Sequence, residues 1–160
     1  MRSKPRIKIL LKDSYLQFIK NSVGSKSWRN FYALVGGRKK DIMQDGELSC
    51  ASFVSSVLLM FDLIKKRHAT VQGTIKDMKE SGWYEIKELK RGAILIWEKR
   101  DFPEGSKHFH IGFAVGKKKA ISNSHKHKSP QVHHITYGAK NNKPARKIEK
   151  IFWHKKLDKL

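Results

Sequence analysis

Cys50 is the only cysteine of the 160-residue chain. It directly precedes the apolar stretch 51–64, which has the composition of a buried helix. In the first turn of a helix, unpaired backbone amides and the helix dipole favour a thiolate over a thiol. The same amides, that of Ala51 included, can hold an oxyanion. The sequence therefore predicts a nucleophilic cysteine with a lowered pKa, against the alternative that Cys50 is a small core residue.

A cysteine nucleophile needs a base, and the chain has eight histidines. His110 lies in the alternating apolar run 109–115, which is typical of a strand, and His108 shares its strand face. A His-x-His pair with one distal histidine can bind zinc, but no Asp or Glu accompanies this pair at a recognised spacing. We therefore expect His110 to act as a base, with neither a metal nor another cofactor.

The predicted secondary structure that positions these residues changes from helices to strands near Gly82. Before Gly82 the sequence predicts four helices. They cover residues 13–23, a segment from Trp28 that stops at Gly36, a segment from Glu47 that ends within 65–67, and residues 70–80. A polar loop is predicted at 38–46, between the second and third helices. After Gly82, strands are predicted at 93–97, 109–115, 119–123, 132–137 and 147–153. This order predicts an α+β fold, in which the helix that begins near Cys50 packs on an antiparallel sheet of about five strands.

The length fits one domain. We expect a monomeric single catalytic domain over 1–160, with an N-terminal helical extension at 1–30, a core at 31–124 and basic C-terminal strands at 125–160. The segment 1–11 lacks the pattern of a signal peptide. The stretch 51–64 is shorter than the ~20 residues that cross a bilayer, so no membrane span is expected and the localisation stays open.

Positive charge dominates the chain, with 35 Lys and Arg against 14 Asp and Glu and a net charge of +21. Such a field concentrates anionic partners at the surface. Nucleic acid, an anionic cell-wall polymer and acidic lipid all qualify.

Four short sequence motifs resemble motifs of the NlpC/P60 family in their order and spacing. Ser49-Cys50-Ala51-Ser52-Phe53-Val54 resembles the Asp-Cys-Ser-Gly-Phe-Val word that opens the catalytic helix of that family. His110-Ile111-Gly112-Phe113-Ala114-Val115-Gly116 is similar to its His-Val-Gly-Ile-Tyr-Leu-Gly strand, and the stretch 89–97 resembles the strand that enters its sheet. The stretch 31–37 resembles its Tyr-x-x-Gly-Gly segment.

The resemblance implies a papain-like cysteine peptidase or amidase with Cys50 as nucleophile, His110 as general base and Tyr32 beside the nucleophile. It also implies a peptidoglycan substrate, cut at a stem-peptide or muramyl-amide bond. The related CHAP amidases share the order of cysteine and histidine. Ser49 and Ser52 replace an acidic residue and a glycine of the family word, so the roles of those two family residues are not carried over.

In such enzymes a third polar residue on the next strand orients the histidine through its second ring nitrogen. Counting along the predicted strand favours Ser122. The chemistry favours Asn123, because its amide oxygen accepts an imidazole N–H better than a hydroxyl does. We rank Asn123 first, with His133 and His134 as outside candidates.

Two other functions are compatible with the sequence. A strongly basic protein can bind nucleic acid through its lysines alone, leaving Cys50 incidental, although no recognised RNA-binding signature or helix-turn-helix word is present. A papain-like site can also transfer an acyl group to an amine or a lipid instead of to water.

Overall fold

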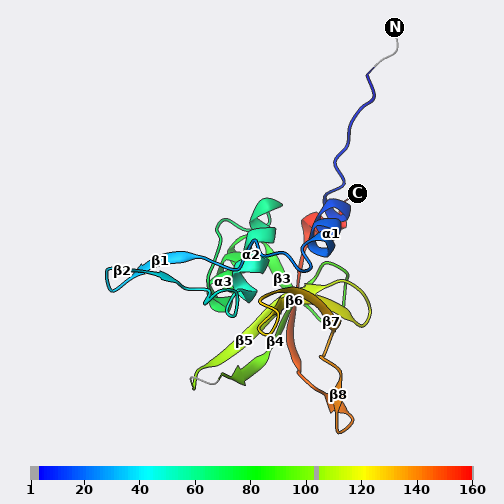
Figure 1. Cartoon of the computed structure of the whole chain (residues 1–160). Helices are drawn as coiled ribbons and strands as arrows, with labels where there is room; N and C mark the ends of the chain where they lie inside the picture. The colour runs from blue at the N-terminus through cyan, green and yellow to red at the C-terminus, as the bar shows by residue number, and fades with distance from the viewer. Residues whose placement is uncertain (1–3, 103–104, 160) are drawn as a thin grey trace.

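Three helices and a sheet of six strands make up the computed structural model, which describes residues 4–102 and 105–159 (Figure 1). The first three residues of the predicted N-terminal extension lie outside these ranges. The helices are α1 (Leu11–Asn21), α2 (Cys50–Met60) and α3 (Val71–Glu80), and a short 3₁₀ helix, η1 (Lys155–Asp158), follows the last strand. The strands are β1 (Tyr32–Val35), β2 (Arg38–Asp41), β3 (Trp83–Ile86), β4 (Ile94–Asp101), β5 (Lys107–Ala114), β6 (Lys119–Ser124), β7 (Ser129–His134), β8 (Ala139–Lys140), β9 (Lys143–Pro144) and β10 (Ile148–His154). The predicted α+β class is confirmed.

The main sheet has the strand order β3-β10-β4-β5-β6-β7, and each neighbouring pair runs antiparallel. The five predicted strands correspond to β4, β5, β6, β7 and β10. The sixth, β3, is only four residues long and pairs with β10, the last strand of the chain. In the part of the chain that the structure describes, no helix is both long and apolar enough to cross a bilayer.

Helix α2 packs on β5 and β6, with Phe53, Val54, Val57 and Leu58 fully buried. Its apolar residues face nearly every direction, as the sequence predicts for a central helix. It ends at Met60, however, and does not reach 65–67. The chain turns at Asp62, which has the left-handed φ of 53°, and the amide of Leu63 bonds back to the carbonyl of Leu58.

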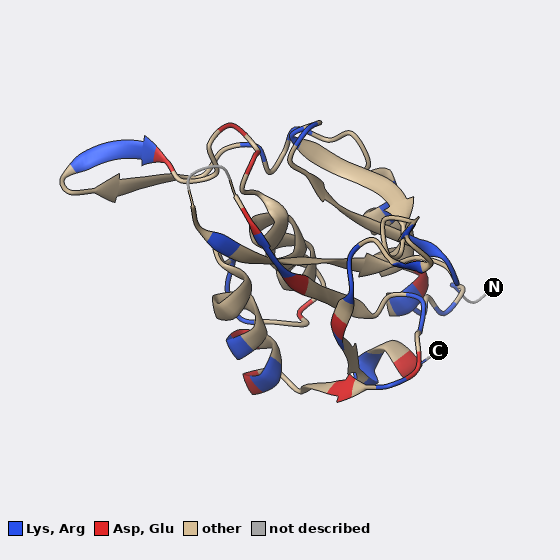
Figure 2. Ribbon diagram, turned by 90° about the horizontal axis from the view of Figure 1, so that it is seen from below, with Lys and Arg blue, Asp and Glu red and all other residues tan. Residues whose placement is uncertain are grey.

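The stretch predicted as a helix from Trp28 and a loop at 38–46 instead contains a β-hairpin. Strands β1 and β2 pair from Tyr32 with Asp41 to Val35 with Arg38, and they project from the body of the molecule (Figures 1 and 2). Gly36 and Gly37 form the two-residue turn, with φ values of 58° and 76°. Two consecutive positive φ angles are what a tight hairpin turn requires, and two glycines supply them without strain.

A buried carboxylate, Asp77 of α3, holds the segment that follows α2. It accepts hydrogen bonds from the backbone amides of Lys65 and Lys66, from Ser81 Oγ, and from His68 Nε2 at 2.7 Å. These donors outweigh the effect of burial, which raises the pKa, and lower the pKa of Asp77 to about 2. The segment fixed in this way continues into residues 69–72, which form one wall of the cavity described below.

Replacing Asp77 by asparagine is expected to lower the free energy of unfolding at pH 7 by about 2 kcal/mol. The folded pKa lies below the unfolded value, so this stabilisation is complete above about pH 4 and is lost as the pH falls toward 2. Urea unfolding at pH 7 and at pH 2.5 measures both effects, with exposed Asp13→Asn as the control. An Asp77→Asn difference as large at pH 2.5 as at pH 7 contradicts this assignment.

Candidate active site

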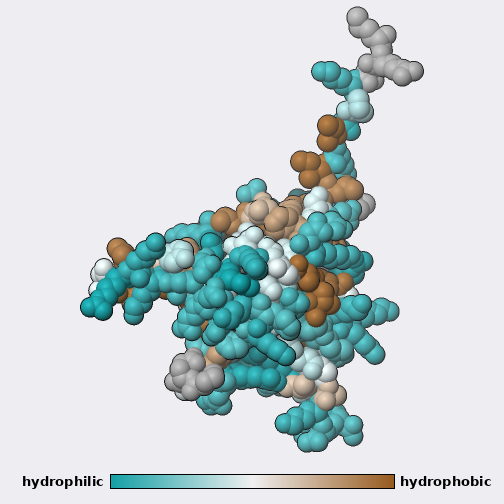
Figure 3. All heavy atoms as spheres, in the orientation of Figure 1, coloured by the Kyte–Doolittle hydropathy of each residue, from teal (hydrophilic) through white to brown (hydrophobic). Residues whose placement is uncertain are grey.

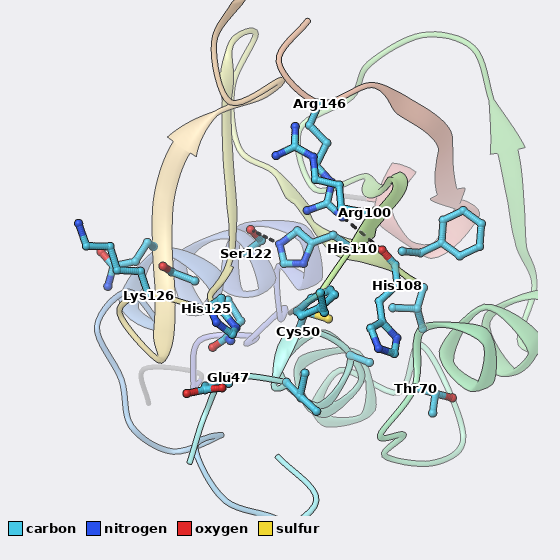
Figure 4. Close-up of a pocket in the computed structure, with 18 of the residues that line it drawn as sticks. Glu47, Cys50, Thr70, Arg100, His108, His110, Ser122, His125, Lys126 and Arg146 are labelled. Carbon is cyan, nitrogen blue, oxygen red and sulfur yellow. Dashed lines mark hydrogen bonds between the residues drawn. The ribbon is translucent and has the colours of Figure 1, made fainter. Parts of the chain in front are cut away.

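A cavity of about 950 Å³ opens where the start of α2 meets β5, β6 and the end of β7 (Figure 4). Cys50, His110 and Ser122 all line it, together with Ala51. Four further histidines line the same cavity: His108, His125, His127 and His133. Within residues 4–102 and 105–159, no group of three His, Cys, Asp or Glu side chains is arranged to hold a metal ion.

Cys50 lies in the first turn of α2, as the sequence predicts, although the helix begins at Cys50 itself and not at Glu47; the residue is partly exposed. The amides of Ala51, Ile111 and Cys50 itself lie near enough to the sulfur to act against the effect of burial on the pKa of the thiol. Because Ile111 directly follows His110 on β5, the thiol lies against the strand that carries the predicted base. The helix start and the strand therefore bring Cys50 and His110 into one site.

The charge state of this pair differs from the one that the sequence suggests. Burial raises the pKa of Cys50, and the three amides and Arg146 only partly offset it. Burial, and then the charges of Arg146, His133 and Arg100, lower the pKa of His110 well below its ordinary value. Both shifts favour the neutral forms. The prediction of a lowered cysteine pKa is wrong because desolvation outweighs the helix amides, and the resting pair is a thiol and a neutral imidazole.

His110 Nε2 lies 2.8 Å from Ser122 Oγ, and His133 Nε2 lies 2.7 Å from the same oxygen. His133 Nδ1 lies 2.7 Å from the carbonyl oxygen of His134, which only accepts, so Nδ1 carries the proton. Nε2 of neutral His133 is then an acceptor, and the Ser122 hydroxyl donates to it.

With its single proton given to His133, the Ser122 oxygen accepts from its other neighbours. His110 Nε2–H is one donor, and the hydroxyl of Tyr137, 3.0 Å away, is the other. These hydrogen bonds assign the tautomer of His110, leaving Nδ1 unprotonated. The ring is packed against Trp97, with 5.4 Å between ring centroids. The hydrogen bond to Ser122 and the packing on Trp97 thus fix the orientation of the His110 imidazole, and the lone pair of Nδ1 can accept a proton.

Among the described residues, no hydrogen bond joins Asn123, ranked first as the orienting residue, to His110. Its Nδ2 donates to the carbonyl of Gly46 at 2.8 Å and so ties β6 to the turn before α2. Neighbouring residues of a strand face opposite sides, and Ser122 occupies the side of the imidazole. The ranking of Asn123 over Ser122 is therefore corrected, because strand register outweighs the better acceptor chemistry of the amide.

Tyr32, predicted beside the nucleophile, lies on the projecting hairpin with 58% of its side chain surface exposed and is not part of the cavity wall. The ammonium of Lys39 lies 4.7 Å from the centre of its ring. The tyrosine at the site is Tyr137, whose ring stacks on His133 with centroids 4.0 Å apart. No spacing in the sequence indicates it, because it reaches the cavity from the turn after β7.

Of the two outside candidates, His133 is in the network and His134 is not. His134 Nδ1 accepts from the amides of Thr136 and Gly138, which fixes the turn after β7. The cavity also holds Arg100 and Arg146, which the sequence does not distinguish from the many other cations. Comparison of the chain with models of known protein families and with curated proteins found no match.

Proposed function

We propose that this protein is a cysteine hydrolase that cleaves an amide bond, with Cys50 as the nucleophile and His110 as the base. The observation that carries the proposal is that Cys50, at the start of α2, and His110, whose Nε2 is bound to Ser122, both face one cavity (Figure 4). This leaves Nδ1 as the nitrogen that takes the thiol proton.

The reaction follows from the charge states of the site. Nδ1 of neutral His110 accepts the Cys50 proton as the sulfur attacks the carbonyl carbon. The carbonyl oxygen gains negative charge, which the amides at the start of α2, those of Cys50 and Ala51, are suited to hold. The imidazolium then protonates the leaving amine. Water, deprotonated by the same histidine, releases the acyl group as a carboxylic acid.

We propose peptidoglycan as the substrate and a papain-like fold of the NlpC/P60 or CHAP type. The sequence words and the order of a nucleophile helix followed by an antiparallel sheet support the fold. The net charge of +21 supports an anionic wall polymer as the target, since it draws such a polymer to the surface. The visible face in Figure 3 is mostly hydrophilic, and lysines and arginines are spread over many elements in Figure 2.

Product analysis tests this function. Purified peptidoglycan incubated with the protein is expected to release soluble fragments, each cut adding one free amine and one free carboxylate, as read by mass spectrometry. Transfer of the acyl group to an added amine without a new carboxylate identifies an acyltransferase instead. Undigested polymer, combined with salt-sensitive retention on nucleic acid, favours the nucleic-acid-binding alternative.

A further inference from the structure

Two arginine side chains meet beside His110 in the cavity (Figure 4). Arg100 is near the end of β4, and Arg146 precedes β10. Arg146 donates from Nε and Nη2 to the carbonyl of Glu98, at 3.2 and 2.9 Å, and from Nη2 to the carbonyl of His108 at 3.4 Å. Arg100 donates to the carbonyl of Ala145. The partners of both guanidinium groups are thus neutral carbonyl oxygens.

Within residues 4–102 and 105–159, neither arginine forms an ion pair with a carboxylate. The Glu98 carboxylate instead accepts the backbone amide of Lys147 at 3.0 Å. Burial lowers the pKa of Arg146 and the charge of Arg100 lowers it further, while Tyr137, Cys50 and the Glu98 carboxylate act in the opposite direction and offset the shift only in part. Arg146 is half-buried and Arg100 is exposed beside it, so the two cations repel each other, and no carboxylate of the described residues touches either guanidinium group. An anion that contacts both groups relieves this repulsion, which the carbonyl contacts do not.

The arginine pair lies on the histidine side of the site. Figure 4 shows both arginine side chains beside the His110 ring, and Arg146 Nη2 donates to the carbonyl of His108, two residues before His110 on β5. In amide cleavage the nucleophile contacts the acyl carbon, and the histidine contacts the leaving nitrogen that it protonates. A group bound at the arginines therefore belongs to the amine half of the substrate.

We propose that Arg100 and Arg146 bind a carboxylate carried by the amine half of the scissile amide. The proposal rests on the proposed hydrolase function and adds the substrate class, an amide whose leaving group is an amino acid residue with a free carboxylate. Nη1 of Arg146 makes no hydrogen bond to any described residue, so it can donate to a carboxylate oxygen while Nε and Nη2 keep their carbonyl partners. A phosphate presents similar oxygens, so the test includes both anions.

Binding of such a carboxylate also changes the base. The charges of Arg100 and Arg146 disfavour the imidazolium form of His110 in the empty cavity. An anion between them offsets these charges and raises the pKa of His110 toward its ordinary value. The correct substrate thus prepares the imidazole to accept the Cys50 proton, while a substrate without the carboxylate leaves it a weaker base.

The test measures binding, so that it does not depend on turnover. Calorimetry with the Cys50→Ala protein compares three N-acetylalanyl amides, whose amine halves are alanine, alaninamide and phosphoethanolamine. Binding of the alanine compound is expected to be about tenfold tighter than that of the alaninamide compound. Arg100→Gln is expected to remove this preference. Arg146→Lys, which keeps the charge but loses the guanidinium group that its carbonyl partners hold and that presents Nη1, is expected to weaken it. Exposed Lys118→Gln, outside the cavity, is the charge-matched control.

Equal or undetectable binding of the alanine and alaninamide compounds overturns the carboxylate site, as does a preference that survives Arg100→Gln. Tighter binding of the phosphoethanolamine compound overturns the carboxylate assignment in favour of phosphate. A carboxylate preference in a protein that cleaves no amide retains the site and rejects the hydrolase. Amide cleavage without that preference retains the hydrolase and rejects the site.

Discussion

Replacing Cys50 by alanine is expected to lower kcat/KM for amide cleavage by at least about 10⁴-fold. The side chain supplies the atom that bonds to the carbonyl carbon, and no other cysteine can replace it. The amides of Ala51 and Ile111 remain in place, so substrate binding is retained while covalent chemistry stops. Initial rates of fragment release from purified peptidoglycan, measured by new free amines, give the comparison.

The matched control for this substitution is Ser56→Ala. It removes one atom of similar size from the same helix, and among the described residues Ser56 Oγ has no hydrogen-bond partner to lose. Both variants are expected to unfold at nearly the wild-type temperature. Undiminished cleavage by a folded Cys50→Ala protein rejects the nucleophile assignment.

Replacing His110 by alanine is expected to lower kcat by about 10³-fold, within the range typical of a general base. The raised pKa of Cys50 makes this effect large, because the thiol carries a proton at neutral pH that an acceptor must remove. As the pH is raised, the solvent increasingly deprotonates Cys50 itself. The deficit of His110→Ala is therefore expected to shrink above pH 9, which a pH series of single-turnover rates measures.

Ser122→Ala provides the comparison for His110. Ser122 Oγ bonds to the imidazole, and its hydrogen bonds within the described residues do not include the thiol, so it acts by positioning, and its loss is expected to cost about tenfold in kcat. His110 Nε2 then loses the acceptor that selects its tautomer, so the loss is expected in kcat with little change in KM. A pH-independent loss for His110→Ala, or a Ser122→Ala effect as large as that of His110→Ala, contradicts the assigned roles.

The sequence predicts those parts of the site that are marked by one strong local pattern. An apolar stretch predicts α2 with Cys50 in its first turn, three residues after the predicted start at Glu47, and an alternating run predicts β5 with His110 on it. Thr70 likewise caps α3 through its side chain at the predicted boundary. Such local patterns are strong because burial and capping act within a few residues.

The remaining contacts depend on tertiary structure. The sequence predicts a helix where β1 forms and a loop where β2 forms, although two adjacent glycines between them are typical of a hairpin turn. Choosing Ser122 over Asn123 requires the register of β6, and Tyr137 reaches the site through a turn. Arg146 lies among many cations in sequence, and only the folded chain shows that no carboxylate pairs with it among the described residues.

Alkylation of Cys50 in the native protein, followed by mass spectrometry across a pH series, tests the central claim most directly. We expect iodoacetamide to modify Cys50 completely below the unfolding transition, because its sulfur lines an accessible cavity. The raised pKa of the thiol means that the rate is low at pH 6 and rises with pH through 9 and above. A Cys50 that reacts only after the protein unfolds is a core residue and contradicts the account.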